Sequence, residues 1–182
     1  MMQKINQISN GVKNKGFTLI EIVVAVAIFT LLIGASAGVF ISSLKNQKQG
    51  LATQEVLDQT SYLMEYMSRA IRMAKKDMTG SCTGTAKLNY IFEDQCLKFI
   101  NYNDECQQFC LEGTRLKDEN GNYLTSESLQ VSNFTVALTG TSQPPTDYLQ
   151  PRVTVSFNIL GQEQAAMKIQ TTISQRNLDI RK

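Results

Sequence analysis

A single carboxylate, Glu21, stands in an otherwise uncharged apolar run that extends from Phe17 to Leu44. An ionised side chain at membrane depth is costly, and it usually has a function and a partner. The run contains no Lys or Arg, so the partner of Glu21 has to come from elsewhere. A cut after Gly16 would create an α-amino group on Phe17, and this cation could meet Glu21 of its own helix or of a neighbouring helix.

Four cysteines form the second group of chemically interesting residues: Cys82, Cys96, Cys106 and Cys110. An even number in a polar, loop-rich region favours two disulfides in an oxidising compartment. The alternatives are free thiols and zinc, although the spacing contains no C-x-x-C pair and the chain has no His. Three pairings are open, of which Cys82–Cys96 with Cys106–Cys110 is the simplest.

The chain offers little for catalysis. Without His, neither a Ser-His-Asp nor a Cys-His nucleophile system exists within it. It has no phosphate-binding loop and no Gly-rich dinucleotide fingerprint. A formal net charge of +2 gives no indication of a specific nucleic-acid partner. We therefore expect no enzyme, no cofactor and no metal. Calcium is the alternative for the loop acids Glu93, Asp94, Asp104 and Glu105, which lack the D-x-D-x-D-G pattern.

The apolar run is long enough to cross a membrane as a helix. At 1.5 Å per residue it spans about 42 Å, whereas a bilayer core is about 30 Å thick. Lys13 and Lys15 precede the run and predict a cytoplasmic N-terminus, with the cysteines on the other side. Two simpler interpretations are a plain single-pass anchor and a secretory signal peptide cut after Ala37. Neither gives Glu21 a role.

The stretch KGFTLIE, Lys15 to Glu21, resembles the processing site of type IV prepilins and of the pseudopilins of type II secretion. The resemblance implies that a prepilin peptidase removes a leader, residues 1–16, by cutting after Gly16. It also implies N-methylation of Phe17 and a role for Glu21 in assembly. The implied partners are other pilin or pseudopilin subunits, the peptidase, an inner-membrane assembly platform and membrane lipid.

Small residues interrupt the apolar run near its middle. Gly34 and Gly38 form a G-x-x-x-G pattern, which predicts close packing between helices of neighbouring subunits. Many major pilins carry Pro at the position that Gly38 occupies. Its absence favours a minor pilin or a pseudopilin.

Beyond the predicted membrane helix, residues 17–44, the pattern indicates an amphipathic helix over 45–77 and a disulfide-containing antiparallel β domain over 78–182. One face of the helix is apolar at spacings of three, four and seven, with Leu57 and Met64 alongside this stripe: Val56, Leu63, Met67, Ile71 and Ala74. Strand-like alternation or apolar segments occur at 86–92, 96–102, 129–140, 151–161 and 165–174. The stripe of the helix would cover one face of the sheet. The expected fold is α+β and pilin-like.

The sequence thus predicts a structural filament subunit, inserted in the inner membrane and later exposed in an extracellular or periplasmic filament. The main alternative is a membrane-anchored extracytoplasmic binding module that is not polymerised. A secreted domain released after Ala37, or an envelope hydrolase using carboxylates, would be further alternatives.

Overall fold

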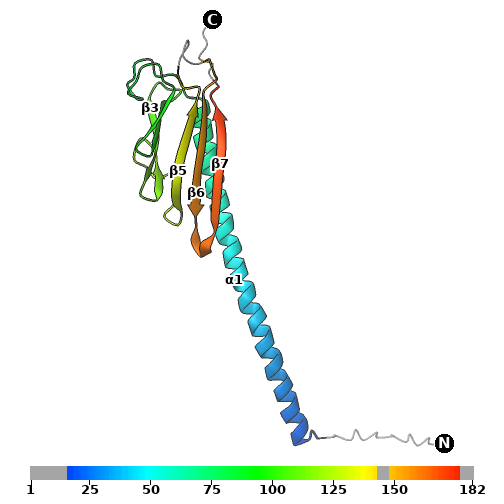
Figure 1. Ribbon diagram of the computed structural model, residues 1–182. Helices are drawn as coiled ribbons and strands as arrows, with labels where there is room; N and C mark the ends of the chain where they lie inside the picture. The colour runs from blue at the N-terminus through cyan, green and yellow to red at the C-terminus, as the bar shows by residue number, and fades with distance from the viewer. Residues whose placement is uncertain (1–15, 143–147, 177–182) are drawn as a thin grey trace, which may run out of the picture. The chain divides into compact units, whose positions relative to one another are not determined.

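The computed structural model describes residues 16–142 and 148–176, so all of the expected leader except Gly16 lies outside it. The chain divides into two compact units, Met1–Lys45 and Asn46–Lys182. The helix α1 (Leu19–Arg72) contributes to both of them (Figure 1).

The second unit combines the end of α1 with antiparallel strands, so the predicted α+β class is confirmed. The described strands form two sheets, whereas the sequence analysis expected one. The first sheet has the order β1-β2-β3-β4, with β1 (Tyr90–Glu93), β2 (Cys96–Ile100), β3 (Cys106–Glu112) and β4 (Arg115–Lys117). The second has the order β5-β6-β7, with β5 (Gln130–Thr139), β6 (Arg152–Leu160) and β7 (Ala166–Ser174). The short 3-10 helix η1 (Gln162–Gln164) joins the last two strands.

The predicted apolar stripe of α1 is the side that covers the sheets. Its buried members Val56, Leu63, Met67 and Ile71 join one core with the inward residues of both sheets. Ala52 and Thr60 lie on the same buried face. Leu57, expected beside the stripe, is instead 43% exposed, because it lies one residue beyond Val56 and so points away from the core. Burial of apolar surface stabilises a fold by about 25 cal/mol for each Å² removed from water. Packing of this stripe is therefore the main interaction that holds the helix against the sheets.

The helix ends at Arg72 rather than at residue 77, because partners distant in the sequence take over its last carbonyl groups. Tyr90 Oη donates a hydrogen bond to the carbonyl oxygen of Ile71 at 2.7 Å, and the Arg176 amide donates to that of Arg72 at 2.8 Å. The chain then leaves the helix, and the Lys75 amide donates to the Ile100 carbonyl at 2.9 Å. These long-range bonds satisfy groups that a helix end otherwise leaves unpaired.

The segment that begins at Cys106 is strand β3, although the strand-like segments expected from the sequence do not include it. It lies between β2 and β4 and buries Gln107 and Phe109 on one face. The Gln107 side chain donates to Tyr66 Oη at 3.3 Å, so a polar residue occupies an inward position with a partner. The prediction was wrong because apolar alternation is weak in a strand whose inward face includes Gln.

Two disulfides are present, as predicted, but their pairing differs from the simplest expectation. They join Cys82 to Cys106 and Cys96 to Cys110. The register of β2 and β3 places Cys96 directly opposite Cys110, with their Cα atoms 4.0 Å apart. Cys106 and Cys110 lie on the same strand, where four residues span about 13 Å, too far for a disulfide. The pairing Cys106–Cys110 is therefore excluded by the strand itself.

A bulge in β5 changes which of its residues face the core. The register shifts between Ser132 and Thr135, and Asn133 has a φ of 52°. The extra residue lets Val131 and Phe134 both face inward although they are three positions apart. Val136, two residues beyond Phe134, is half-buried.

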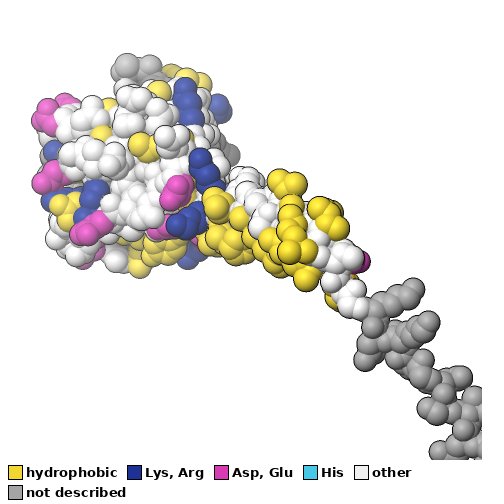
Figure 2. Space-filling view, turned by 90° about the horizontal axis from the view of Figure 1, so that it is seen from below, with side chains coloured by type: hydrophobic (Ala, Val, Ile, Leu, Met, Phe, Trp, Pro, Cys, Tyr) yellow, Lys and Arg dark blue, Asp and Glu magenta, His cyan; other side chains and the backbone are white. Residues whose placement is uncertain are grey.

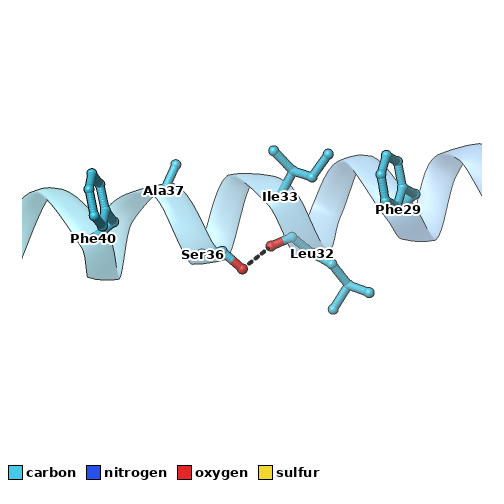
Figure 3. Close-up of a pocket in the computed structure, with 6 residues that line it drawn as sticks. All are labelled: Phe29, Leu32, Ile33, Ser36, Ala37 and Phe40. Atoms are coloured by element: carbon cyan, nitrogen blue, oxygen red, sulfur yellow. Dashed lines mark hydrogen bonds between the residues drawn. The ribbon is translucent and has the colours of Figure 1, made fainter.

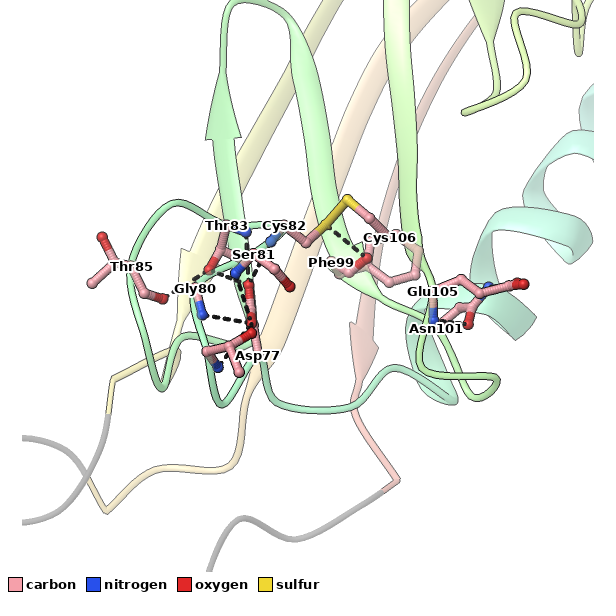
Figure 4. The surroundings of a disulfide bond; sticks show 11 residues. Asp77, Gly80, Ser81, Cys82, Thr83, Thr85, Phe99, Asn101, Glu105 and Cys106 are labelled. Carbon is pink, nitrogen blue, oxygen red and sulfur yellow. Dashed lines mark hydrogen bonds between the residues drawn. A yellow bond between two sulfur atoms is a disulfide. The ribbon is translucent and has the colours of Figure 1, made fainter.

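The loop after α1 is organised around the carboxylate of Asp77, which is 1% exposed (Figure 4). One oxygen accepts hydrogen bonds from the amide of Gly80 at 2.7 Å, and the other from the amides of Cys82 at 2.8 Å and Thr83 at 2.9 Å. Burial of the carboxyl group raises its pKa, but these bonds outweigh burial and leave the pKa of Asp77 lowered well below its ordinary value. The ionised side chain is thus the form that the fold stabilises.

We expect Asp77→Asn to destabilise the sheet unit by about 2–3 kcal/mol at neutral pH, because an amide presents two donors to groups that are themselves donors. The lowered pKa in the folded state gives a stabilisation that is present above the unfolded value of about 4 and is lost as the pH falls. Urea unfolding of the full chain in detergent at pH 7 and pH 3 should therefore show a difference between wild type and variant that narrows at pH 3.

Asp104→Asn is the matched control. Asp104 is an exposed acid whose carboxylate forms an ion pair with Lys75 Nζ at 2.8 Å. Such a surface pair contributes about 0–1 kcal/mol to the free energy of unfolding. Equal losses for the two variants at pH 7 would contradict the role given to Asp77.

Gly161 permits a close approach of the β6–η1 turn to α1. A Cβ atom there would overlap Cγ2 of Val56, although the φ of −104° is open to any residue. Gly161→Ala should therefore destabilise the chain by about 1–3 kcal/mol through overpacking. Val56→Ala removes the obstructing methyl groups, so the double variant should lose less stability than the sum of the single variants in a double-mutant cycle. Strictly additive losses would show that the two positions are not coupled.

Candidate functional site

The first turn of α1 begins two residues after the expected cut. Gly16, Phe17 and Thr18 are not helical, and the helix starts at Leu19. Thr18 is its N-cap: Thr18 Oγ1 accepts a hydrogen bond from the Glu21 amide at 3.3 Å, and the Thr18 carbonyl accepts from the Ile22 amide, also at 3.3 Å. The peptide bond between Gly16 and Phe17 therefore lies outside the helical hydrogen bonds.

Glu21 is the third residue of the helix, where free amide groups and the helix dipole favour a negative charge. This favourable term is about 0.3–1 kcal/mol, which is small beside the several kcal/mol that burying a carboxylate costs. Within the described part of the chain Glu21 makes no ion pair. The helix end lowers the cost of the charge without removing the need for a cation.

The apolar segment that follows covers no other part of the described chain. Every residue from Gly16 to Leu51 is exposed, including Leu19 at 83%, Leu31 at 75% and Val39 at 73%. Hydrophobic side chains gather on this segment, in contrast to the mixed surface of the sheets (Figure 2). It belongs to the one helix of the described residues that is long and apolar enough to cross a membrane. A helix that is hydrophobic on all sides needs lipid or other helices around it.

Small side chains make a shallow hollow in this segment. Ser36 and Ala37 lie between the rings of Phe29 and Phe40, with Leu32 and Ile33 completing the lining (Figure 3). Ser36 Oγ donates to the Leu32 carbonyl at 2.8 Å, so the hydroxyl is satisfied within the helix. Gly34 and Gly38 also face open space, with nothing within 4 Å of an added Cβ. A second helix could approach closely here.

The loop acids considered for calcium do not form a shared site. Asp104 is paired with Lys75, and Glu105 Oε2 accepts from Asn101 Nδ2 at 3.3 Å. Glu93 and Asp94 belong to the β1–β2 hairpin instead. Among the residues with a described placement, no three acidic, Cys or His side chains converge as metal ligands.

Thr18 is the site residue that sequence reasoning missed. The pattern Ser/Thr-x-x-Glu before an apolar run is a sequence sign of a helix start, and Thr18 to Glu21 fits it. The structure also leaves the predicted roles of Gly16, Phe17, Glu21 and the two glycines of the run as predictions, since it contains a single chain.

Comparison with known families supports the interpretation of the N-terminus. Residues 12–37 match the family model described as the prokaryotic N-terminal methylation motif. The match covers Gly16, Phe17 and Glu21 and none of the residues of the sheets. Comparison with curated proteins gave no match, and neither did comparison with solved structures. The class that these findings define is therefore a chain with the methylation motif on a long apolar helix and a disulfide-bonded α+β unit.

We expect Ala37→Phe to weaken association between copies of the apolar helix by about 1–3 kcal/mol, because the added ring fills the hollow that a second helix would enter. Energy transfer between labelled full chains in micelles measures this association. Leu31→Phe is the control, since Leu31 already presents a large side chain. If the two variants associate equally well, the hollow is not a packing surface.

Proposed function

We propose that this chain is a structural subunit of a type IV pilus-like filament, processed by prepilin peptidase and assembled through its N-terminal helix. The observation that carries the proposal is the apolar segment of α1, which is exposed along its whole length and has one carboxylate in its first turn. The match to the methylation motif over residues 12–37 supports it independently. An apolar anchor alone would explain the length of the segment but not Glu21.

The exposed segment suits two successive environments. Lipid covers a helix that is apolar all round before assembly, and other copies of the same helix can replace the lipid afterwards. Because helix and lipid are similarly apolar, the change of surroundings costs little hydrophobic energy. Close packing at Ser36, Ala37, Gly34 and Gly38 would favour the assembled state.

Glu21 would set the position of one copy against the next. Removal of residues 1–16 leaves an α-amino group on Phe17, and methylation keeps its positive charge. Pairing of this cation with Glu21 of an adjacent copy would offset the cost of the carboxylate and fix the axial stagger. A head-to-tail contact of this kind does not close on itself, so it generates a fibre.

The rest of the chain fits an extracytoplasmic location. Lys13 and Lys15 precede the apolar segment and would stay in the cytoplasm under the positive-inside rule. The disulfides Cys82–Cys106 and Cys96–Cys110 then form on the oxidising side. We place the functional boundaries at the leader 1–16, the membrane and filament-core helix 17–44, the amphipathic helix from 45, and the β domain that follows. The β domain would form the filament surface.

Within this class we favour a minor pilin or a pseudopilin. Gly38 stands where many major pilins have Pro, and α1 continues through Gly34 and Gly38 without a break. The role is structural, through contacts with other subunits and with an inner-membrane assembly platform, and involves no catalysis.

Mass spectrometry of the N-terminus of the native protein tests the processing step. We expect methylated Phe17 as the first residue. An N-terminus at Gly38 would indicate a secreted domain cut after Ala37, and an intact Met1 would indicate an anchored binding module that is not polymerised. Either of these two results would exclude the filament subunit as proposed.

Glu21→Ala tests the assembly step. We expect normal membrane insertion and leader removal but a loss of incorporation into sheared filaments of about a hundredfold or more. The reason is that leaving a buried charge unpaired costs about 3–5 kcal/mol, and each 1.4 kcal/mol is about tenfold. Glu65→Ala is the control, because Glu65 is an exposed acid of the same helix that pairs with Arg69. Incorporation of Glu21→Ala at the level of Glu65→Ala would sink the proposed pairing.

A further inference from the structure

We propose that Thr18 is a positioning residue for leader removal, because its N-cap stops α1 before the helix reaches the Gly16–Phe17 bond. The inference rests on the proposed processing after Gly16. It assigns a task to an uncharged residue that follows Phe17 directly in the sequence.

The geometry at Thr18 is that of a complete N-cap. Its carbonyl oxygen accepts from the Ile22 amide at 3.3 Å and from the Glu21 amide at 3.1 Å. Its hydroxyl oxygen accepts from the same Glu21 amide at 3.3 Å. An N-cap residue has non-helical backbone angles, so the chain before it leaves the helix axis.

The result is a non-helical scissile bond beside a long helix. Gly16 and Phe17 are non-helical and exposed, with Phe17 at 78% and nothing within 4 Å of a Cβ added to Gly16. Hydrolysis adds water across this bond, giving a carboxylate on Gly16 and an amine on Phe17. A peptidase can surround an exposed, irregular segment on all sides, whereas a bond inside a helix is held by hydrogen bonds to neighbouring turns.

Gly16 alone does not stop the helix at this point. Gly is unfavourable in a helix, but Phe17 is tolerated in one. In lipid, backbone groups need partners within the chain, which favours continuation of the helix before Leu19. An uncapped helix would therefore extend backwards over Phe17 towards the leader. The Thr18 hydroxyl opposes this by satisfying an amide that the preceding turn would otherwise have to satisfy.

The test uses the full chain in lipid nanodiscs with a prepilin peptidase, and follows release of the leader by mass spectrometry. Thr18→Ala and Thr18→Leu remove the cap and favour helix, so we expect about fivefold slower cleavage, the factor that corresponds to a typical N-cap. Thr18→Ser and Thr18→Asp keep a capping oxygen, and they should be cut within about twofold of the wild-type rate. Thr30→Ala removes another hydroxyl of the same helix, which donates to the Ala27 carbonyl at 2.9 Å, and should have no effect.

A second measurement separates helix position from direct recognition by the peptidase. Amide hydrogen exchange at Leu19 and Ile20 is measured without peptidase. It should slow in Thr18→Ala and Thr18→Leu, because a helix that extends backwards supplies these two amides with carbonyl partners one turn earlier, and it should stay fast in Thr18→Ser and Thr18→Asp. Equal cleavage of Thr18→Ala and Thr18→Ser overturns the inference while the proposed function stands. Slow cleavage of Thr18→Asp with unchanged exchange also overturns it, by pointing to contact with the enzyme. A wild-type chain that is not cut after Gly16 overturns the proposed processing and this inference together.

Discussion

The apolar side chains in the N-terminal part of α1 need to be shielded from water, and no other part of the described chain shields them. A soluble fold would not tolerate so large an exposed apolar surface, because monomeric proteins rarely expose more than a few hundred Å² in one patch. Lipid and other copies of the helix are the surroundings that meet the requirement. Membrane insertion and the proposed filament assembly would both provide this cover.

The same helix meets a different requirement after Asn46. There its apolar residues narrow to one stripe, and the two sheets cover that stripe with a core that includes Phe99, Phe109, Phe134 and Phe157. The disulfide Cys82–Cys106 and the hydrogen bonds to Asp77 hold the loop after α1, and Cys96–Cys110 joins β2 to β3. The core residues of this unit are thus buried within the unit itself, in contrast to the exposed apolar segment that precedes it.

The charge at Glu21 connects these two requirements. In the first turn it gains from the helix dipole, yet that gain is too small to keep a carboxylate unpaired in an apolar medium. Thr18 fixes where that turn begins, so the two residues before it, Gly16 and Phe17, are not helical. The proposed site consists of a cap, a carboxylate and the amine that a cut after Gly16 would create. It needs few residues, because the helix supplies the geometry.

The sequence by itself determined the apolar segment, the lone carboxylate, the stripe at Val56, Leu63, Met67 and Ile71, and the α+β class. These features follow from local periodicity and composition, which act over a few turns or one strand. Only the tertiary structure decided the end of α1 at Arg72, the strand β3 and the pairing Cys82–Cys106 with Cys96–Cys110. Each of these depends on residues far apart in the chain: Tyr90 and Arg176 on the helix carbonyls, and the β2–β3 register on the cysteines. No local pattern encodes a hydrogen bond to a carbonyl group a hundred residues away.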